Sequence, residues 1–318
     1  MAQIGTNLEV AKTILDQGGL VAIPTETVYG LAGNALDITA VTSIFKTKER
    51  PSFDPLIVHT FSLDQVRNFV QEIPKQAIQL AERFWPGPLT LLLKKKDIVP
   101  DLVTSGLNTV AVRIPNHPVT LELLRQINYP LAAPSANPFG YISPTSALHV
   151  DHQLGDKIEY ILDGGPCKIG VESTIIGFEN EIPTIHRLGG MSIERIESIV
   201  GKVEVQDHSD SNPSAPGMLK SHYAPKKGII LGDIDELLQV YKNNNPGILS
   251  FDHNYDLIDP SKQIQLSSDG DLDKAAQNLF GSLRQLDGMN ISIILAEFVP
   301  NHGLGRAIND RLKRAAAK

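Results

Sequence analysis

A cluster of cations near the N-terminus is the first set of residues suited to chemistry. Lys46, Lys48 and Arg50 lie where a predicted helix runs into Pro51, a residue that disfavours helical conformation in the residue before it. The cations therefore converge at a loop. Arginine there can bind phosphate oxygens through its planar fork, and lysine can add a movable point charge. The plainer interpretation is a solvated helix end whose cations complement the helix dipole.

Polar residues that interrupt or follow apolar runs are the second set. His59 and Arg113 each stand in a strand-like run, where a polar side chain is costly unless it is paired. They are therefore candidates for binding a polar or anionic ligand. Ser135 and Asn137 follow another strand-like run and can hydrogen-bond a ligand from the strand end, although Ser-x-Asn is also a common turn.

The elements that must position these residues alternate between strand-like and helical patterns. This alternation predicts an α/β fold, in which a sheet is covered by helices. A first helix is expected after Asn7, which can cap it. The expected strands are Leu20 to Ile23, Leu56 to Phe61, Leu89 to Leu93, Val110 to Ile114, Ile158 to Leu162 and Thr174 to Phe178. The further expected helices are Thr39 to Lys46, Lys75 to Phe84, Thr120 to Ile127 and Ile193 to Val200.

A break in this pattern divides the chain. Residues 207–228 are rich in Pro, Ser and Lys, which is typical of a linker. Residues 229–318 then repeat the alternation of strands and helices on a smaller scale. We therefore expect a first domain over 1–206, a linker over 207–228 and a smaller α/β domain over 229–318.

Several short motifs occur in one order along the chain. They are Pro-Thr-Glu-Thr-Val-Tyr-Gly-Leu at 24–31, Lys-Glu-Arg at 48–50, Val-Ala-Val-Arg-Ile-Pro at 110–115, Ser-Ala-Asn at 135–137 and Val-Glu-Ser-Thr at 171–174. Together they resemble the threonylcarbamoyl-AMP synthases of the Sua5/YrdC/YwlC family. Ser-Ala-Pro-Gly-Met at 214–218 and His-Tyr-Ala-Pro at 222–225 are similar to the linker of the long, two-domain Sua5 form.

The resemblance implies a fold and an activity. The expected fold is a YrdC-like twisted mixed sheet with helices and an open concave site, followed by a smaller Rossmann-like α/β/α Sua5 domain. The expected reaction joins L-threonine, bicarbonate or CO2 and ATP into threonylcarbamoyl-AMP and pyrophosphate. This product serves the N6-threonylcarbamoyladenosine modification of tRNA at the adenosine next to the anticodon, through a separate downstream transferase. Mg²⁺ is expected with ATP, held by phosphates and water, and no protein ligand is implied for it.

Roles for individual residues also follow from the resemblance. Lys48 is expected at the reacting centre and Arg50 on ATP, and both count as catalytic. Around L-threonine the resemblance places Thr27, His59, Arg113, Ala133 and Ser173. Around ATP it places Arg50, Asp54, Thr109, Ser135, Asn137, Ser143, Arg187 and Tyr223, the last on a linker that folds back as a lid.

Position 54 departs from the pattern of the family. Many relatives have asparagine there, whereas Asp54 adds a carboxylate beside the triphosphate unless magnesium or a lysine intervenes. The effect of this exchange is left open by the sequence.

Net charge and cysteine content exclude some of the other protein classes that the sequence could represent. A formal charge of −7 argues against a protein that coats nucleic acid with its whole surface, but an RNA-binding or regulatory module with a local basic groove stays open. The single cysteine, Cys167, cannot form a zinc cluster, which excludes the related hydrogenase-maturation proteins. Because neither a leader nor an apolar run of about 18 residues is evident, we expect a cytoplasmic protein without a membrane span.

Overall fold

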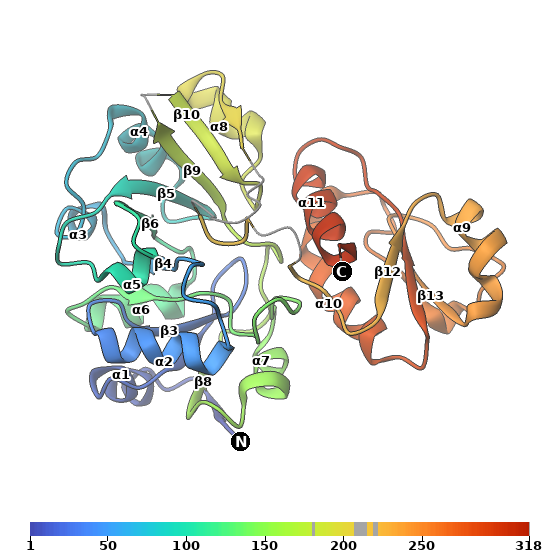
Figure 1. Cartoon of the computed structure of the whole chain (residues 1–318), viewed down its shortest axis with the longest axis horizontal. Helices are drawn as coiled ribbons and strands as arrows, with labels where there is room; N and C mark the ends of the chain where they lie inside the picture. The colour runs from blue at the N-terminus through green and yellow to red at the C-terminus, as the bar shows by residue number, and fades with distance from the viewer. Residues whose placement is uncertain (180–181, 207–214, 219–221, 318) are drawn as a thin grey trace. The chain divides into compact units, whose positions relative to one another are not determined.

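The computed structural model describes residues 1–179, 182–206, 215–218 and 222–317, in two compact units (Figure 1). The first unit comprises Met1–Phe139, Ser143–Lys168 and Glu172–Leu219. The second comprises Gly140–Ile142, Ile169–Val171 and Lys220–Lys318. Of the predicted linker, residues 207–214 and 219–221 lie outside the described residues.

Eleven strands among the described residues form one mixed sheet in the first unit, in the order β1-β8-β2-β3-β7-β4-β6-β5-β9-β10-β11. The strands β4 and β6 at its centre are parallel, whereas β5 runs antiparallel to β6. The strands are β1 (Gln3–Gly5), β2 (Val21–Ile23), β3 (Gly30–Asn34), β4 (Ile57–His59), β5 (Leu89–Lys94), β6 (Thr109–Arg113), β7 (Leu131–Ala132), β8 (Tyr160–Leu162), β9 (Thr174–Glu179), β10 (Ile182–Arg187) and β11 (Glu204–Val205).

Helices of the first unit begin and end at residues suited to those places. Asn7 caps the first helix through the N–H of Glu9, and Asp37 caps α2 through the N–H of Thr39. The helix α2 ends at Lys48, and its C-cap residue Glu49 has a φ of 55°. The helices are α1 (Leu8–Asp16), α2 (Ile38–Lys48), α3 (Leu63–Val66), α4 (Lys75–Phe84), α5 (Asp101–Thr104), α6 (Pro118–Gln126), α7 (Ala147–Leu154) and α8 (Ile193–Val200).

The two faces of the central strands have different neighbours, because successive side chains of a strand point to opposite faces. Val110 and Val112 of β6 join the main core, to which α2, α4, α5, α7 and α8 contribute. Ala111 packs on the other face, in a small apolar cluster. By the same alternation Thr109 and Arg113 project from the face of Ala111, which is therefore the face that carries the candidate site.

Helices cover one end of this site face. The helices α1 and α6 pack there against β2, β7 and β8, in a core cluster that includes Leu131. His59 is the strand partner of Leu131 on one side and of Arg113 on the other. The candidate residues therefore stand between a helix-covered end of the sheet and the apolar cluster around Ala111.

A parallel four-stranded sheet organises the second unit, in the order β12-β15-β13-β14. On one face Ile248 and Leu295 pack with Ile234 and Leu238 of α9. The helices α10 and α11 contact β13 and β12 respectively. These elements are β12 (Gly228–Leu231), α9 (Ile234–Tyr241), η1 (Lys242–Asn244), β13 (Pro246–Ser250), η2 (Pro260–Lys262), β14 (Gln263–Gln265), α10 (Leu272–Gly288), β15 (Ile293–Ala296) and α11 (Gly305–Ala316).

The predicted α/β class and the mixed sheet are confirmed, and the differences concern the elements' ends and the short strands. The fourth strand extends over Ile57–His59 only, shorter than predicted, although the N–H of Thr60 still donates to the carbonyl oxygen of Arg113. The strands β1, β3, β10, β11 and β14 were not predicted from the sequence pattern, whereas β7 is the strand-like run before Ser135. Among the described residues, no helix combines the length and the apolar character that crossing a bilayer requires.

Candidate active site

Adjacent strands bring His59 and Arg113 together. The parallel register of β4 and β6 pairs the two residues directly, and both side chains are buried. Burial, reinforced by the positive charge of Arg113, lowers the pKa of His59 to about 3. His59 is therefore a neutral hydrogen-bonding group at physiological pH and not a second cation.

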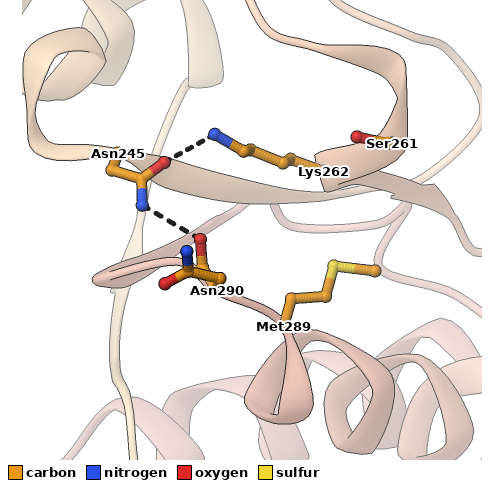
Figure 2. Close-up of a pocket in the computed structure, with 5 residues that line it drawn as sticks. All are labelled: Asn245, Ser261, Lys262, Met289 and Asn290. Atoms are coloured by element: carbon orange, nitrogen blue, oxygen red, sulfur yellow. Dashed lines mark hydrogen bonds between the residues drawn. The ribbon is translucent and has the colours of Figure 1, made fainter.

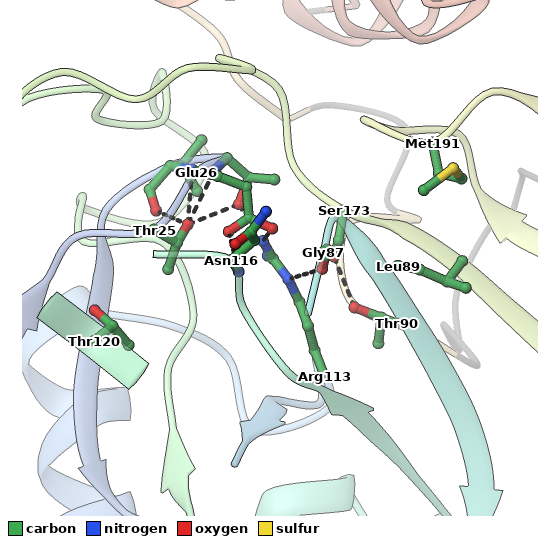
Figure 3. A network of polar contacts seen from close by, with 12 residues as sticks. Thr25, Glu26, Gly87, Leu89, Thr90, Arg113, Asn116, Thr120, Ser173 and Met191 are labelled. Carbon is green, nitrogen blue, oxygen red and sulfur yellow. Dashed lines mark hydrogen bonds and ion pairs between the residues drawn. The ribbon is translucent and has the colours of Figure 1, made fainter. Parts of the chain in front are cut away.

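The guanidinium of Arg113 lies in a polar network with the loop that follows β2 (Figure 3). Its Nη2 lies 2.8 Å from Oε1 of Glu26, and its Nη1 donates to Oγ1 of Thr27 at 2.9 Å. Its Nε donates to the carbonyl oxygen of Gly87 at 3.1 Å. Oε2 of Glu26 accepts the N–H of Asn116 at 3.0 Å, which fixes the acid on its other side. The predicted carboxylate-binding arginine is thus held rigidly before any substrate arrives.

Ser173 bonds to a second arginine, Arg187. Its Oγ lies 2.7 Å from Oγ1 of Thr90, and the two hydroxyls share a hydrogen bond. Arg187 donates from Nε and Nη2 to the carbonyl oxygen of Ser173, at 3.1 and 2.9 Å, and from Nη2 to its Oγ at 3.1 Å. Ser173 therefore joins the residues expected around L-threonine to one expected around ATP.

Lys48 reaches the loop after β7. At the end of α2 its ammonium donates to the carbonyl oxygens of Ser135 and Asn137. Complete burial, followed by the nearby charge of Arg50, lowers the pKa of Lys48 well below its usual range, while Asp54 partly opposes this effect. An ammonium carries three N–H donors, so two carbonyl contacts leave one for a ligand oxygen.

Arg50 lies against the segment that follows it. Its Nε donates to the carbonyl oxygen of Asp54 at 3.0 Å, and its Nη2 donates to that of Pro55 at 2.7 Å. The same Nη2 is 3.0 Å from Oδ2 of Asp54, with both side chains buried. The cation predicted for ATP therefore faces an internal carboxylate.

The remaining predicted residues of the first unit are Ser143, Ala133 and Thr109. Ser143 is buried and donates to Oε1 of Glu172 at 2.5 Å. Ala133 extends the strand region after β7 through a hydrogen bond from its N–H to the carbonyl oxygen of Ile57. Thr109 begins β6 on the same face as Arg113, about 13 Å along the strand at roughly 3.3 Å per residue.

Part of the predicted linker packs on this face of the sheet. Ala215 and Met218 join the cluster formed by Ala111 and its neighbours Ile57, Leu92 and Ile175. Arg187 donates from Nη1 to the carbonyl oxygen of Pro216 at 3.1 Å. The segment 215–218 therefore contacts both the sheet and one of the predicted ATP residues.

Tyr223, the last predicted ATP residue, belongs to the second unit. Its ring stacks on Phe280 at a centroid distance of 5.6 Å, and the guanidinium of Arg311 lies 4.8 Å from the ring centroid. The N–H of the preceding His222 donates to the carbonyl oxygen of Arg314. This part of the linker is thus packed on α10 and α11.

Comparison with known proteins identifies the family. Residues 13–189 match the Sua5/YciO/YrdC family model, described as telomere recombination, and residues 191–317 match the C-terminal domain of threonylcarbamoyl-AMP synthase. The chain is 42% identical to threonylcarbamoyl-AMP synthase of Pyrococcus abyssi, over 97% of this chain and 94% of that protein. The corresponding Bacillus subtilis protein is 40% identical, over 96% and 92% of the two chains. The chain belongs to the threonylcarbamoyl-AMP synthase family.

Solved structures of this family and its relatives agree with that assignment. The crystal structure of P. abyssi Sua5 complexed with L-threonine matches with a TM-score of 0.93 and 40% identity, over 99% of this chain and 97% of that chain. Escherichia coli YciO matches 59% of this chain with a TM-score of 0.54 at 22% identity, which shows a shared fold alone. The predicted family and its two-part architecture are therefore confirmed.

Two acids of the candidate site were not assigned a role from the sequence. Glu26 and Glu172 both stand inside the motifs that carry the family resemblance, each next to a hydroxyl-bearing residue. Their signal was an acid inside a run of otherwise uncharged residues, where burial demands a partner. The structure supplies these partners as Arg113 for Glu26 and Ser143 for Glu172.

The side chains of the candidate site can also be compared with the ligands that a metal ion requires. Within the described part of the chain, no group of three or more His, Cys, Asp or Glu side chains is placed to hold one. The carboxylate of Asp54 is paired with Arg50, which removes the acid nearest the cations from an obvious cage. Phosphate oxygens and water are the ligands that Mg²⁺ usually keeps in nucleotide sites, so a magnesium ion bound with ATP requires no dedicated protein cage.

A separate cavity of about 330 Å³ lies in the second unit, lined by Asn245, Ser261, Lys262, Met289 and Asn290 (Figure 2). Lys262 donates to the side-chain oxygen of Asn245, whose amide donates to the carbonyl oxygen of Asn290. The lining residues precede β13, β14 and β15 and so mark the amino ends of parallel strands, whereas ligands of open α/β sheets bind at the carboxyl ends. This cavity contains none of the residues predicted for the active site.

Proposed function

We propose that this chain is an L-threonylcarbamoyladenylate synthase, which forms threonylcarbamoyl-AMP and pyrophosphate from L-threonine, bicarbonate or CO2 and ATP. The observation that carries the proposal is the hydrogen-bonded connection from Arg187 through Ser173 to Thr90, beside the network of Arg113. Arg113 and Arg187 project from one face of one sheet, and this shared face supports a common site for the two predicted substrates. The product would serve threonylcarbamoyladenosine modification of tRNA, through a separate transferase.

In this proposal Arg113 binds the carboxylate of L-threonine. A guanidinium has five N–H donors, and three contacts with Gly87, Thr27 and Glu26 leave two for a substrate. Neutral His59 and the hydroxyls of Thr27 and Ser173 offer donors and acceptors for the polar groups of the amino acid. Ala133 contributes its backbone at the same end of β7.

Lys48, Arg50 and Arg187 bind the phosphates of ATP in the same proposal. The carbamate of threonine and the α-phosphate are both anionic, so fixed cations oppose their repulsion and stabilise the charge that develops as pyrophosphate leaves. Magnesium bound with ATP would supply further neutralisation of the triphosphate. The hydroxyls and amides of Thr109, Ser135, Asn137 and Ser143, together with Tyr223, are the remaining proposed ATP contacts.

The test of this function is pyrophosphate release from ATP that requires both L-threonine and bicarbonate. Because Lys48 adds a charge-assisted donor at the proposed reacting centre, Lys48→Gln is expected to reduce that release by about 10²- to 10³-fold. Lys46→Gln, which removes an exposed lysine from the same helix, is the matched control and is expected to retain activity. ATP hydrolysis that ignores both small substrates would contradict the proposal.

A further inference from the structure

One carboxylate lies among the cations of the proposed phosphate site. Asp54 is fully buried, at 0% exposure, and its Oδ2 lies 3.0 Å from Nη2 of Arg50. Burial raises its pKa, while Arg50, Lys48 and Arg187, in that order, act to lower it. All three cations that are proposed to bind ATP therefore already interact electrostatically with one internal carboxylate.

The contacts of Arg50 show whether Asp54 orients this arginine or only adds a charge beside it. Two backbone carbonyl oxygens, those of Asp54 and Pro55, accept N–H groups of the guanidinium and hold it in place. These carbonyls persist whatever side chain stands at position 54. The carboxylate is therefore not needed to orient Arg50, and what it adds is a negative charge.

A negative charge at this place opposes a phosphate ligand. Inside a protein the effective dielectric is well below that of water, so charges several ångström apart still interact by more than 1 kcal/mol. A phosphate oxygen that approaches Arg50 must compete with Oδ2 of Asp54 for the same guanidinium and is repelled by its charge. Both effects weaken binding. An amide at this position would remove the repulsion and compete less strongly for the guanidinium.

We infer that Asp54 is an internal competitor for Arg50, whose charge lowers the affinity of this chain for the phosphates of ATP and for pyrophosphate. The inference rests on the proposed function, which places those phosphates at Lys48, Arg50 and Arg187. During turnover, the charge of Asp54 lowers the affinity of the site for the pyrophosphate product. Asp54 thereby sets how tightly the site binds phosphate without touching the reacting atoms.

The experiment compares inorganic pyrophosphate binding by the full chain and by Asp54→Asn, using calorimetry without ATP, L-threonine or bicarbonate. The amide is nearly the same size as the carboxylate, so the main change is the loss of the negative charge. We expect the dissociation constant for pyrophosphate to fall about three- to tenfold. Affinity for L-threonine is expected to stay as in the wild type, because Arg113 is paired with Glu26 instead.

The matched control is Asp101→Asn, which removes the same charge from an exposed carboxylate paired with Lys95. It is expected to leave pyrophosphate binding unchanged. Thermal unfolding checks that each variant folds, and Asp54→Ser, also uncharged, replaces Asp54→Asn if the latter does not.

Three results decide the matter. Tighter pyrophosphate binding by the uncharged variant, with Asp101→Asn unchanged, supports the inference. Equal or weaker binding overturns it and leaves the proposed function standing. If neither the wild type nor the variant binds pyrophosphate, the placement of the phosphates fails as well, and the inference falls with it.

Discussion

Two arginines of the candidate site have acidic partners in the folded chain, Glu26 for Arg113 and Asp54 for Arg50. Breaking a buried ion pair is costly because it leaves an uncompensated charge, although the intact pair adds little net stability. The two pairs differ in their second partner. Glu26 also accepts a backbone N–H, from Asn116, and so links Arg113 to a second loop. We interpret Glu26 as a residue that positions Arg113.

His59 gives a prediction at the same scale. Its pKa is about 3 in the folded chain and near 6.5 when unfolded, so between these values the unfolded chain binds a proton that the folded one does not. The free energy of unfolding therefore falls as the pH drops below about 6.5, by up to about 1.4 kcal/mol per pH unit from this residue. Above that pH both forms are neutral and the contribution is constant.

Urea unfolding at pH 7 and pH 5 measures this contribution. His59→Asn removes the titrating group and is expected to show a shallower loss of stability on acidification than the wild type. Comparing the two proteins cancels the carboxylates that titrate in both. An equal pH dependence in the two proteins would contradict the burial of a neutral imidazole.

The linker is the element whose two described parts belong to different units. Residues 215–218 pack on the first sheet beside Arg187, whereas His222 and Tyr223 pack on α10 and α11. The described residues 215–218 contact a predicted ATP residue, because Arg187 donates to the carbonyl oxygen of Pro216. We propose that it acts as the lid that the family resemblance implies.

Tyr223 supplies the prediction at the scale of this element. Because its ring contacts Phe280 and Arg311, Tyr223→Ala is expected to destabilise the second unit by about 3 kcal/mol. Tyr223→Phe keeps the ring and is expected to preserve stability while it raises KM for ATP. Chemical unfolding and initial rates separate the two effects. Wild-type kinetics in Tyr223→Phe would exclude a role for the hydroxyl on the nucleotide.

At the scale of the whole molecule, a ligand that binds the folded state is expected to raise the free energy of unfolding. A ligand at ten times its dissociation constant stabilises the folded state by about 1.4 kcal/mol. For a unit of this size that raises the unfolding midpoint by roughly 3–5 °C. We expect L-threonine to produce this shift in the wild type and to lose it in Arg113→Lys, because lysine cannot reproduce the planar fork that meets a carboxylate.

Thermal unfolding with and without L-threonine tests this prediction without any turnover. Pyrophosphate serves as the internal control, since its proposed contacts are Lys48, Arg50 and Arg187. It is expected to stabilise Arg113→Lys as it does the wild type. A threonine shift that survives in Arg113→Lys would remove this arginine from the amino-acid site.

The amino-acid sequence by itself determined the family, the α/β class and the identity of most candidate residues. Local patterns carry this information, since side chains of one strand alternate faces and helix ends select their caps. Asn7 before α1 and the cations at the end of α2 could be read without any knowledge of the fold. The six-residue strand β10 was not predicted, because Pro183 and His186 interrupt the alternation of apolar and polar residues that indicates a strand.

Only the tertiary structure decided which residues meet. Glu26 and Arg113 are 87 positions apart, and Ser143 and Glu172 are 29 apart, so no local pattern could join them. Strand order likewise depends on long-range pairing, such as that of His59 with Arg113. The sequence indicates that a buried charge must be paired, because an unpaired buried charge is costly. Which residue pairs with it depends on contacts that form only when the chain folds.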